Sequence, residues 1–548
     1  MMSDTAPRPA TDGSELSILE RIGNARLLTG DEGRVKISSD DRRYVALFDN
    51  NVAILAGATQ YDPRVRMVVK QARTAELVGP DIEYITTETG ILVGLYKKFG
   101  RGSGEVKTES IDIERQAQMA SIIKAAADKG ASDVHMLITR DYTEVRYRLY
   151  GRVLDMMSLS VEDGKALVRA TFAVASDTGN SSSDTSFQQG ALTVRSGILP
   201  TKVNLVRLQY SPTTEGRGTL VSRLIYVTKA GETEIDSLGY SKRHIDDIVT
   251  MRKRTNGLYI IAGKTSSGKS TTLQRVLNKM FMEKKREISM FSIEEPVELD
   301  LPGATQIAAK KAPDGTDGFI EAMKAALRSD PDIIVLGETR SEELANLAIK
   351  AVMSGHAVWS TVHAGSALGI LDRLSDFGVD SWKLVDPTVV RGLIYQRLIG
   401  VMCPHCKVTM TEAVATGSMT QDLADRWAAL FETSTDILTS RGPGCSKCIS
   451  GFTGRTVVAE SVQTDAKLLE LFSEGKRAEM RRYWLESQDT GGMGGNPVLH
   501  HALMKVGAGI CDIENVEEGV DLLSAYERDF MYLQPRLLEE VAAMKART

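Results

Sequence analysis

The sequence lacks the features typical of disulfide-rich, membrane-spanning and secreted proteins. Five cysteines among 548 residues are too few for a disulfide scaffold. No stretch approaches the roughly 18 consecutive apolar residues of a transmembrane helix. Residues 1–15, MMSDTAPRPATDGSE, look disordered and lack the apolar core of a secretory signal. These absences predict a cytoplasmic protein whose association with a membrane, if any, is peripheral and runs through a partner.

Neither sign of charge dominates the chain, and aromatic residues are sparse. Lys and Arg number 67 against 72 Asp and Glu, a net charge of −5, and aromatics make up 6%. This composition offers no general attraction to nucleic acid and few platforms on which bases could stack. We therefore expect no nucleic-acid partner. A chain of this length exceeds a single hydrophobic core, so several domains are expected.

Patterns along the chain predict three parts. Residues 1–110 alternate apolar runs with helix-like stretches, which indicates a small N-terminal α/β domain that docks a partner. Residues 111–235 are rich in strands, with a hairpin signature at 143–153 and a polar loop at 177–186, and should form an α+β domain. Residues 236–548 contain the motifs described next and end in a helical tail.

A phosphate-binding loop is the most specific motif. The run LYIIAGKTSSGKS places Gly-x4-Gly-Lys-Ser between an apolar strand and an amphipathic helix. Glycines let backbone N–H groups wrap phosphates at a helix N-terminus, while Lys269 reaches the β- and γ-phosphates and the Ser270 hydroxyl ligates Mg²⁺. A chance glycine turn is the alternative, which the flanking strand and helix disfavour. The residues predicted to bind ATP are Gly263, Lys264, Thr265, Ser266, Ser267, Gly268, Lys269, Ser270 and Thr271.

Three later apolar runs also end in polar residues suited to phosphate chemistry. The runs ISMFSIEEP, DIIVLGETR and HAVWSTVHA end at Glu294, Glu338 and His363. Ligands of parallel α/β sheets bind outside the carboxyl ends of the strands, so these three residues are predicted to be catalytic. Singly, each has a simpler explanation: Glu294 as a solvated loop carboxylate, Glu338 paired with Arg340, and His363 as a core histidine. Together with the loop they favour ATP hydrolysis.

These blocks resemble the secretion ATPase superfamily that powers type II secretion and type IV pili. The family's Walker A, Asp box, Walker B and His box match GKTSSGKSTT, SIEEPVEL, DPDIIVLGETR and GHAVWSTVHAGSAL, in order and at family-like spacing. The resemblance implies an α/β fold with a RecA-like P-loop motor domain, preceded by a PAS-like α+β domain and the small N-terminal α/β domain.

The resemblance also implies roles for the strand-end residues. Glu294 would activate water, Glu338 would lie near Mg²⁺ and His363 near the γ-phosphate, although which glutamate is the base stays open. Two positions depart from the family pattern: Lys264 stands where Pro is usual, and Glu295 stands where the Asp box usually has Asp.

Four of the five cysteines form two CxxC pairs, Cys403 with Cys406 and Cys445 with Cys448. Four thiolates suit a structural tetrahedral Zn²⁺. A redox pair or unliganded thiols are the alternative, disfavoured because neither pair sits beside a thioredoxin-like strand–helix unit. This element, about residues 400–455, looks like the tetracysteine element of the assembly and secretion members of the family, which retraction ATPases typically lack.

Arginines of the strand-rich part are candidates for completing the site. The segments VRYRLYGRV and VRSGILPTKVNLVRLQY look like the family's second N-terminal domain, in which strand arginines approach the nucleotide. By position these are Arg195, Arg207 and Arg223, and such an arginine would stabilise charge on the transferring phosphoryl group. Exposed strand arginines without this role are the alternative. Tyr150 replaces the Asp common at the family's turn.

The leading hypothesis is a hexameric cytosolic motor ATPase. The resemblance implies a homohexamer that drives assembly of a type IV pilus or pseudopilus through an inner-membrane platform protein. A RecA-like nucleic-acid translocase is one alternative, disfavoured by the charge and aromatic content. A nucleotide-regulated scaffold without turnover is the other, and the intact strand-end residues argue against it.

Overall fold

The computed structural model describes residues 15–30, 33–37, 41–99, 107–176, 186–213, 217–227, 233–298, 300–309 and 317–546. The predicted disordered start and the predicted polar loop at 177–186 lie almost entirely outside these ranges. The chain divides into two compact units, Met1–Val227 and Thr228–Thr548. Within the described ranges, no helix is both long and apolar enough to cross a membrane. The three-domain division stays a prediction.

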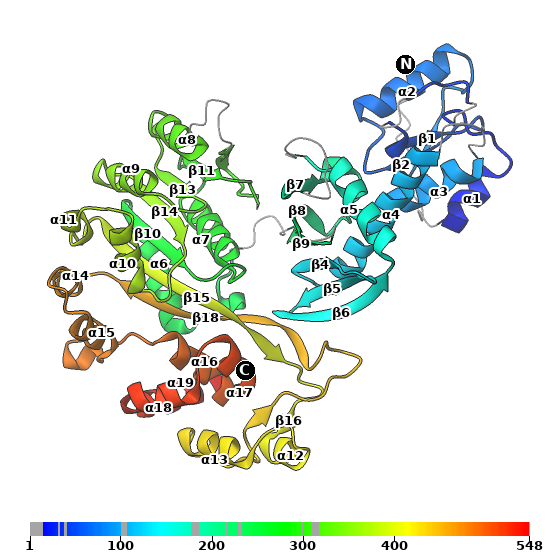
Figure 1. The fold of residues 1–548 in the computed structure, drawn as a ribbon. Helices are drawn as coiled ribbons and strands as arrows, with labels where there is room; N and C mark the ends of the chain where they lie inside the picture. Colours follow the sequence, from blue (N-terminus) through cyan, green and yellow to red (C-terminus); the bar gives the residue numbers. More distant parts are fainter. Residues whose placement is uncertain are drawn as a thin grey trace. The chain divides into compact units, whose positions relative to one another are not determined.

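The first unit begins with a three-stranded sheet of order β1-β2-β3 (Figure 1). Its first pair is antiparallel and its second is parallel. All five residues of β2 are buried, because helices cover both faces of this small sheet. The elements are α1 (Glu15–Ile22), η1 (Asp41–Arg43), β1 (Val45–Leu47), β2 (Val52–Ala56), α2 (Pro63–Thr74), β3 (Glu83–Thr87) and α3 (Thr89–Phe99).

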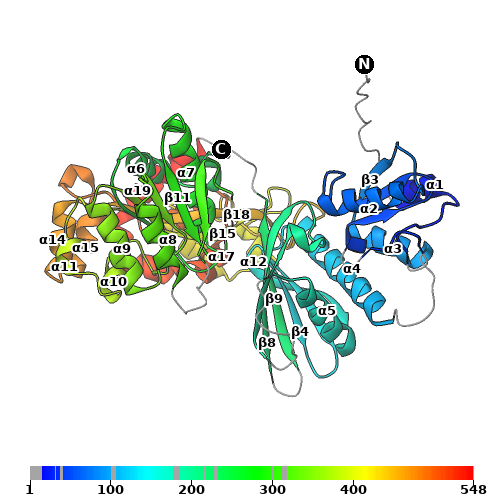
Figure 2. The same cartoon turned by 90° about the horizontal axis from the view of Figure 1, so that it is seen from above.

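The rest of the first unit is a six-stranded antiparallel sheet of order β6-β5-β4-β9-β8-β7. Every second residue of β5 is buried, the period of a strand with one face on a core. The predicted hairpin is confirmed, with Tyr150 and Gly151 at φ +50° and +93° in its turn. Figures 1 and 2 show α4 and α5 packed together beside this sheet. The elements are α4 (Lys107–Asp128), β4 (Asp133–Ile138), β5 (Thr143–Leu149), β6 (Arg152–Leu159), α5 (Val161–Ala173), β7 (Gln188–Thr193), η2 (Val194–Ser196), β8 (Val203–Pro212) and β9 (Gly218–Tyr226).

The second unit is built on a seven-stranded sheet of order β12-β11-β13-β14-β10-β15-β18. All neighbouring pairs are parallel except the last, β15 with β18. Side chains of β10 alternate between two cores: Leu258 and Ile260 pack with α8, α9 and α10, while Tyr259 and Ile261 pack with α6 and α7. This layered arrangement confirms the predicted α/β class. The elements are η4 (Asp236–Leu238), α6 (Lys242–Lys253), β10 (Gly257–Ala262), α7 (Lys269–Glu283), β11 (Met290–Glu294), β12 (Ala304–Ala308), α8 (Gly318–Leu327), β13 (Ile333–Leu336), α9 (Glu342–Met353), β14 (Ala357–Val362), α10 (Gly369–Asp376) and α11 (Ser381–Leu384).

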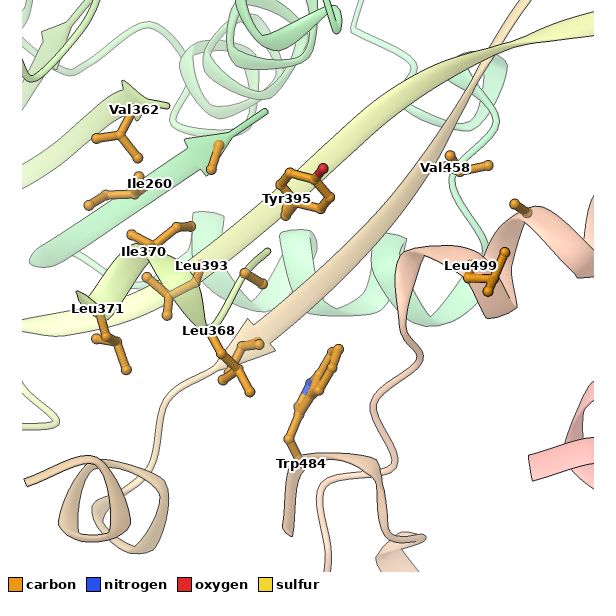
Figure 3. Close-up of a cluster of buried hydrophobic side chains, with 14 of the residues drawn as sticks. Ile260, Val362, Leu368, Ile370, Leu371, Leu393, Tyr395, Val458, Trp484 and Leu499 are labelled. Carbon is orange, nitrogen blue, oxygen red and sulfur yellow. The ribbon is translucent and has the colours of Figure 1, made fainter. Parts of the chain in front are cut away.

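The last two strands of this sheet, β15 and β18, are long, flank the segment with the cysteine pairs and pack against the C-terminal helices. Figure 3 shows Tyr395 of β15 and Val458 of β18 in one apolar cluster with Trp484 and Leu499 from the helices that follow. These helices therefore share the core of the seven-stranded sheet, as expected for a helical tail that packs on it. The elements are β15 (Val390–Met402), β16 (Val408–Thr409), α12 (Met410–Ala415), α13 (Gln421–Leu430), β17 (Thr439–Ser440), β18 (Phe452–Gln463), α14 (Ala466–Ser473), α15 (Arg477–Leu485), η5 (Gln488–Thr490), α16 (Val498–Gly507), α17 (Ile513–Gly519), α18 (Leu523–Asp529), η6 (Met531–Leu533) and α19 (Gln534–Lys545).

Candidate active site

The glycine-rich loop joins the buried strand β10 directly to helix α7. Gly263 is buried at φ +156°, and a Cβ there would lie 2.4 Å from the Gln396 carbonyl oxygen, so the close approach requires glycine. Gly268 takes a left-handed φ of +83° just before the helix begins. The Lys269 ammonium donates to the carbonyl oxygens of Gly263 (2.9 Å) and Lys264 (3.1 Å), so it lies over the loop. Backbone N–H groups of a loop with this geometry, at a helix N-terminus, can hold phosphate oxygens.

Three other strands end beside this loop. The parallel register pairs Ile293 with Leu336, Leu336 with Ser360, and Ile261 with Thr361. Glu294 is the last residue of β11, Glu338 follows the end of β13 by two positions, and His363 follows the end of β14 by one. The structure therefore brings the loop and all three residues to one edge of the sheet, as expected for carboxyl ends of parallel strands.

Glu294 is the half-buried last residue of β11. Its carboxylate accepts hydrogen bonds from the Ser292 hydroxyl (2.6 Å) and the Gln306 amide (3.2 Å). Burial raises the pKa of Glu294, and the two hydrogen bonds oppose that rise only in part. A fixed carboxylate with a raised pKa is better suited to accept a proton than a solvated loop carboxylate.

Glu338 and His363 contact each other across neighbouring strand ends. The Glu338 carboxylate lies 3.1 Å from His363 Nε2, and both side chains are nearly half exposed. The alternative partner of Glu338, Arg340, pairs instead with Glu295 at 2.7 Å. The interpretation of His363 as a core histidine is wrong, since 47% of its side chain is exposed.

A small cavity separates Glu294 from the first turn of α7. Its volume is ≈ 30 Å³ and it has room for a water molecule. Its lining includes Ser270, Leu273, Gln274, Glu294, Val335 and Thr361. Hydroxyl and carboxylate oxygens are the donors that Mg²⁺ prefers, so the Ser270 and Glu294 side of this cavity fits a hard cation.

The polar residues that support the loop and Glu294 were missed by sequence reasoning. Gln396 on β15 donates to the Ser267 carbonyl oxygen at 2.7 Å, and Gln306 on β12 holds Glu294. Thr361 donates to the Gly337 carbonyl oxygen at 2.6 Å and fixes the turn that carries Glu338. In the run GLIYQRLIGVM, Gln396 stands beside Arg397, and nothing in that pattern marks the glutamine as a partner of the loop.

The three candidate arginines all lie in the first unit. Arg195 is in η2, and its carbonyl oxygen accepts a hydrogen bond from the Tyr44 hydroxyl. Arg207 and Arg223 face each other as register partners of β8 and β9. The Arg223 guanidinium lies 3.0 Å from the buried carboxylate of Asp133, so it has a structural partner within this unit.

The two cysteine pairs meet in space. Sγ of Cys403 lies 3.8 Å from Sγ of Cys445, and Sγ of Cys448 lies 3.7 Å from those of both Cys406 and Cys445. All four sulfurs lie within 4.8 Å of one another. Zn–S bonds of about 2.3 Å in a tetrahedron place sulfurs about 3.8 Å apart. The four thiols are therefore spaced for a metal ion and are not disulfides.

The motifs and fold agree with a comparison against known families. The family model described as "Type II/IV secretion system protein" matches residues 108–517. The chain belongs to this family. It is 29% identical over 413 residues to the type II secretion system ATPase E of Vibrio cholerae, covering 74% of this chain and 76% of that protein. It is 28% identical over 456 residues to the type IV pilus assembly ATPase PilB of Thermus thermophilus, covering 81% of this chain and 48% of that protein.

Among solved structures, the pilus retraction motor PilT with bound ADP overlaps with a TM-score of 0.48 at 19% identity, covering 75% of this chain and 99% of that chain. Membership of the family confirms the predicted relationship to the type II secretion and type IV pilus ATPases, whose enzyme class is ATP hydrolase. The predicted α/β P-loop fold and the tetracysteine group are confirmed as well.

Proposed function

We propose that this chain is a homohexameric motor ATPase that hydrolyses ATP to drive assembly of a type IV pilus or pseudopilus. The observation that carries the proposal is the convergence of the glycine-rich loop, Glu294 and the Glu338–His363 pair at one sheet edge. Relatives named as a type II secretion ATPase and as a type IV pilus assembly ATPase support assembly as the process that ATP hydrolysis would drive. We assign the chain to the cytoplasmic side of the inner membrane, where a platform protein would receive the motion.

The loop residues from Gly263 to Thr271 would hold the phosphates of ATP. Backbone N–H groups and the N-terminus of α7 favour the negative charge. Lys269 would exchange its two carbonyl partners for β- and γ-phosphate oxygens, which are stronger acceptors. Ser270 would hold Mg²⁺, which supplies charge neutralisation on the phosphate oxygens when bound.

Glu294 is the residue we assign as the general base. Its raised pKa and its place on a water-sized cavity suit it to orient a water and accept its proton. Glu338 is already engaged by His363, so this pair is better suited to contact the γ-phosphate and metal side of the site. The three candidate arginines, Arg195, Arg207 and Arg223, would stabilise charge on the transferring phosphoryl group.

Zinc in the tetracysteine group would be structural. All four sulfurs would be used, which leaves no open coordination position for catalysis. The metal would tie the ends of β15 and β18 together, because each CxxC pair adjoins one of these long strands.

The proposal is tested in the source organism. Deleting the gene should abolish a surface fibre or a secreted set of proteins, and wild type should restore it. A Lys269→Ala variant should fail to restore it, whereas Lys350→Ala, a change at an exposed lysine of α9 outside the loop, should succeed. Intact fibres and secretion without the chain would overturn the assembly function. Strong stimulation of ATP turnover by single-stranded DNA would favour the translocase instead.

A further inference from the structure

A buried chain of hydrogen bonds lies beneath the glycine-rich loop. The Tyr240 hydroxyl donates to Gln396 Oε1 at 2.6 Å, and Gln396 Nε2 donates to the Ser267 carbonyl oxygen at 2.7 Å. The Tyr240 hydroxyl also lies 3.1 Å from the Thr272 hydroxyl. Tyrosine has one proton, which goes to Gln396, so Tyr240 accepts the proton of Thr272. The four residues are all buried and form one directed chain.

One end of this chain fixes the loop itself. Ser267 stands between Ser266 and Gly268, whose left-handed φ values are +62° and +83°. The backbone conformation of these two residues orients the N–H groups of the loop. The Ser267 carbonyl group lies between them, so its hydrogen bond to Gln396 helps to fix that orientation. Thr272 belongs to the first turn of α7. The chain of hydrogen bonds therefore contacts both the glycine-rich loop and the first turn of α7.

The other end belongs to the segment that connects the two units in sequence. Tyr240 follows residues 233–239, which lie along α7 and α16. The Arg275 guanidinium donates to the Glu234 carbonyl oxygen at 2.7 Å, and the Lys505 ammonium donates to that of Gly239 at 2.6 Å. We call residues 233–240 the connecting segment. Its end at Tyr240 cannot shift without moving the hydroxyl that supports Gln396.

The apolar surroundings disfavour a partly broken chain of hydrogen bonds. Tyr240 packs in an apolar core with Ile261, Val276 and Ile394. A buried polar group left without its partner is costly, so the chain favours either the whole arrangement or another complete one. Loop geometry and segment position are thereby linked.

We propose that Tyr240 and Gln396 are positioning residues that couple the conformation of the phosphate loop to the connecting segment. This inference rests on the proposed nucleotide site. Nucleotide bound to the loop would then favour one position of the connecting segment. By thermodynamic linkage, displacing the segment would weaken nucleotide binding by the same factor by which nucleotide shifts the equilibrium between segment positions.

The test uses the purified full chain and a fluorescent ADP analogue. Tyr240→Phe and Gln396→Met each remove one link, and both are combined in a double variant. The matched control is Tyr259→Phe, because Tyr259 is buried in the same core but its hydroxyl donates to the Asn256 carbonyl oxygen at 2.9 Å, away from the chain. Each single link variant should bind the analogue about five- to tenfold more weakly. The control should stay within about twofold of wild type.

Two readouts separate coupling from a general loss of stability. The double variant should bind no more weakly than Gln396→Met alone, because both changes break the same chain. Nucleotide should slow amide exchange of the connecting segment in wild type and in the control, but not in Tyr240→Phe. Should Gln396→Met fail to fold, Tyr240→Phe, the milder change, still tests the coupling. Binding by Tyr240→Phe equal to that of the control, or multiplicative effects in the double variant, would overturn the coupling. Wild type that binds no nucleotide would instead overturn the proposed function and the coupling with it.

Discussion

Replacing Glu294 with glutamine separates its chemical role from its structural one. The change removes the charge and the ability to accept a proton while keeping the shape of the side chain. The amide oxygen can still accept the hydrogen bonds from Ser292 and Gln306. Because a positioned general base contributes about 10²- to 10⁴-fold to a rate, Glu294→Gln should lower kcat by that factor. Affinity for ATP should change little.

Stability should move in the opposite direction from activity. The pKa of Glu294 is raised in the folded state by burial. Such a group contributes stability that is fully present below the unfolded pKa of about 4.3 and is lost as pH rises through the folded pKa. Above the folded pKa, the ionised carboxylate therefore opposes folding. The glutamine variant should be at least as stable as wild type there, and its advantage should shrink towards pH 4.

Phosphate release and thermal unfolding measure the two effects on the same preparations. The matched control is Glu295→Gln, an adjacent carboxylate that pairs with Arg340 near the surface. This control should keep kcat within about threefold of wild type, because exposed ion pairs contribute little. Glu294→Gln with wild-type kcat, or with a loss no larger than that of the control, would refute the assignment of the base.

Three further predictions concern the metal group, the strand-end pair and a first-unit arginine. Metal analysis should find about one Zn per chain, and Cys406→Ser should lose it with a fall in Tm, whereas Cys511→Ala should keep it; equal zinc in both would contradict the tetracysteine site. Glu338→Gln should lower phosphate release about 10²-fold while a fluorescent ADP analogue still binds, and unchanged release would remove Glu338 from the site. Arg223→Ala should lower the free energy of unfolding by about 1 kcal/mol or less, since Arg223 is over a third exposed and Arg148 lies 3.5 Å from Asp133. A larger loss in chemical denaturation would show a greater structural role.

The sequence was sufficient for features that local patterns determine. The loop could be predicted because its glycines, lysine and serine are contiguous, and the strand ends because apolar runs stop at Glu294, Glu338 and His363. Partners were harder to predict. Arg340 is two residues from Glu338, yet it pairs with Glu295 after another strand, because the order of strands decides which turns meet.

The support beneath the loop could not be predicted at all. Tyr240 and Gln396 are 156 residues apart and meet only because β15 lies beside β10. The same holds for Gln306, which reaches Glu294 through the parallel pairing of β11 and β12. Neither glutamine belongs to a motif, and their positions depend on strand order that a single sequence does not reveal.

The measurement that tests the central claim most directly is Mg²⁺-dependent phosphate release from ATP by the purified protein, with wild type compared with Lys269→Ala. The lysine lies over the phosphate loop, where its ammonium donates to the carbonyl oxygens of Gly263 and Lys264. We predict measurable turnover by wild type and a loss of at least about 100-fold in the variant. Equal turnover by the two proteins, or none by wild type, would contradict the account.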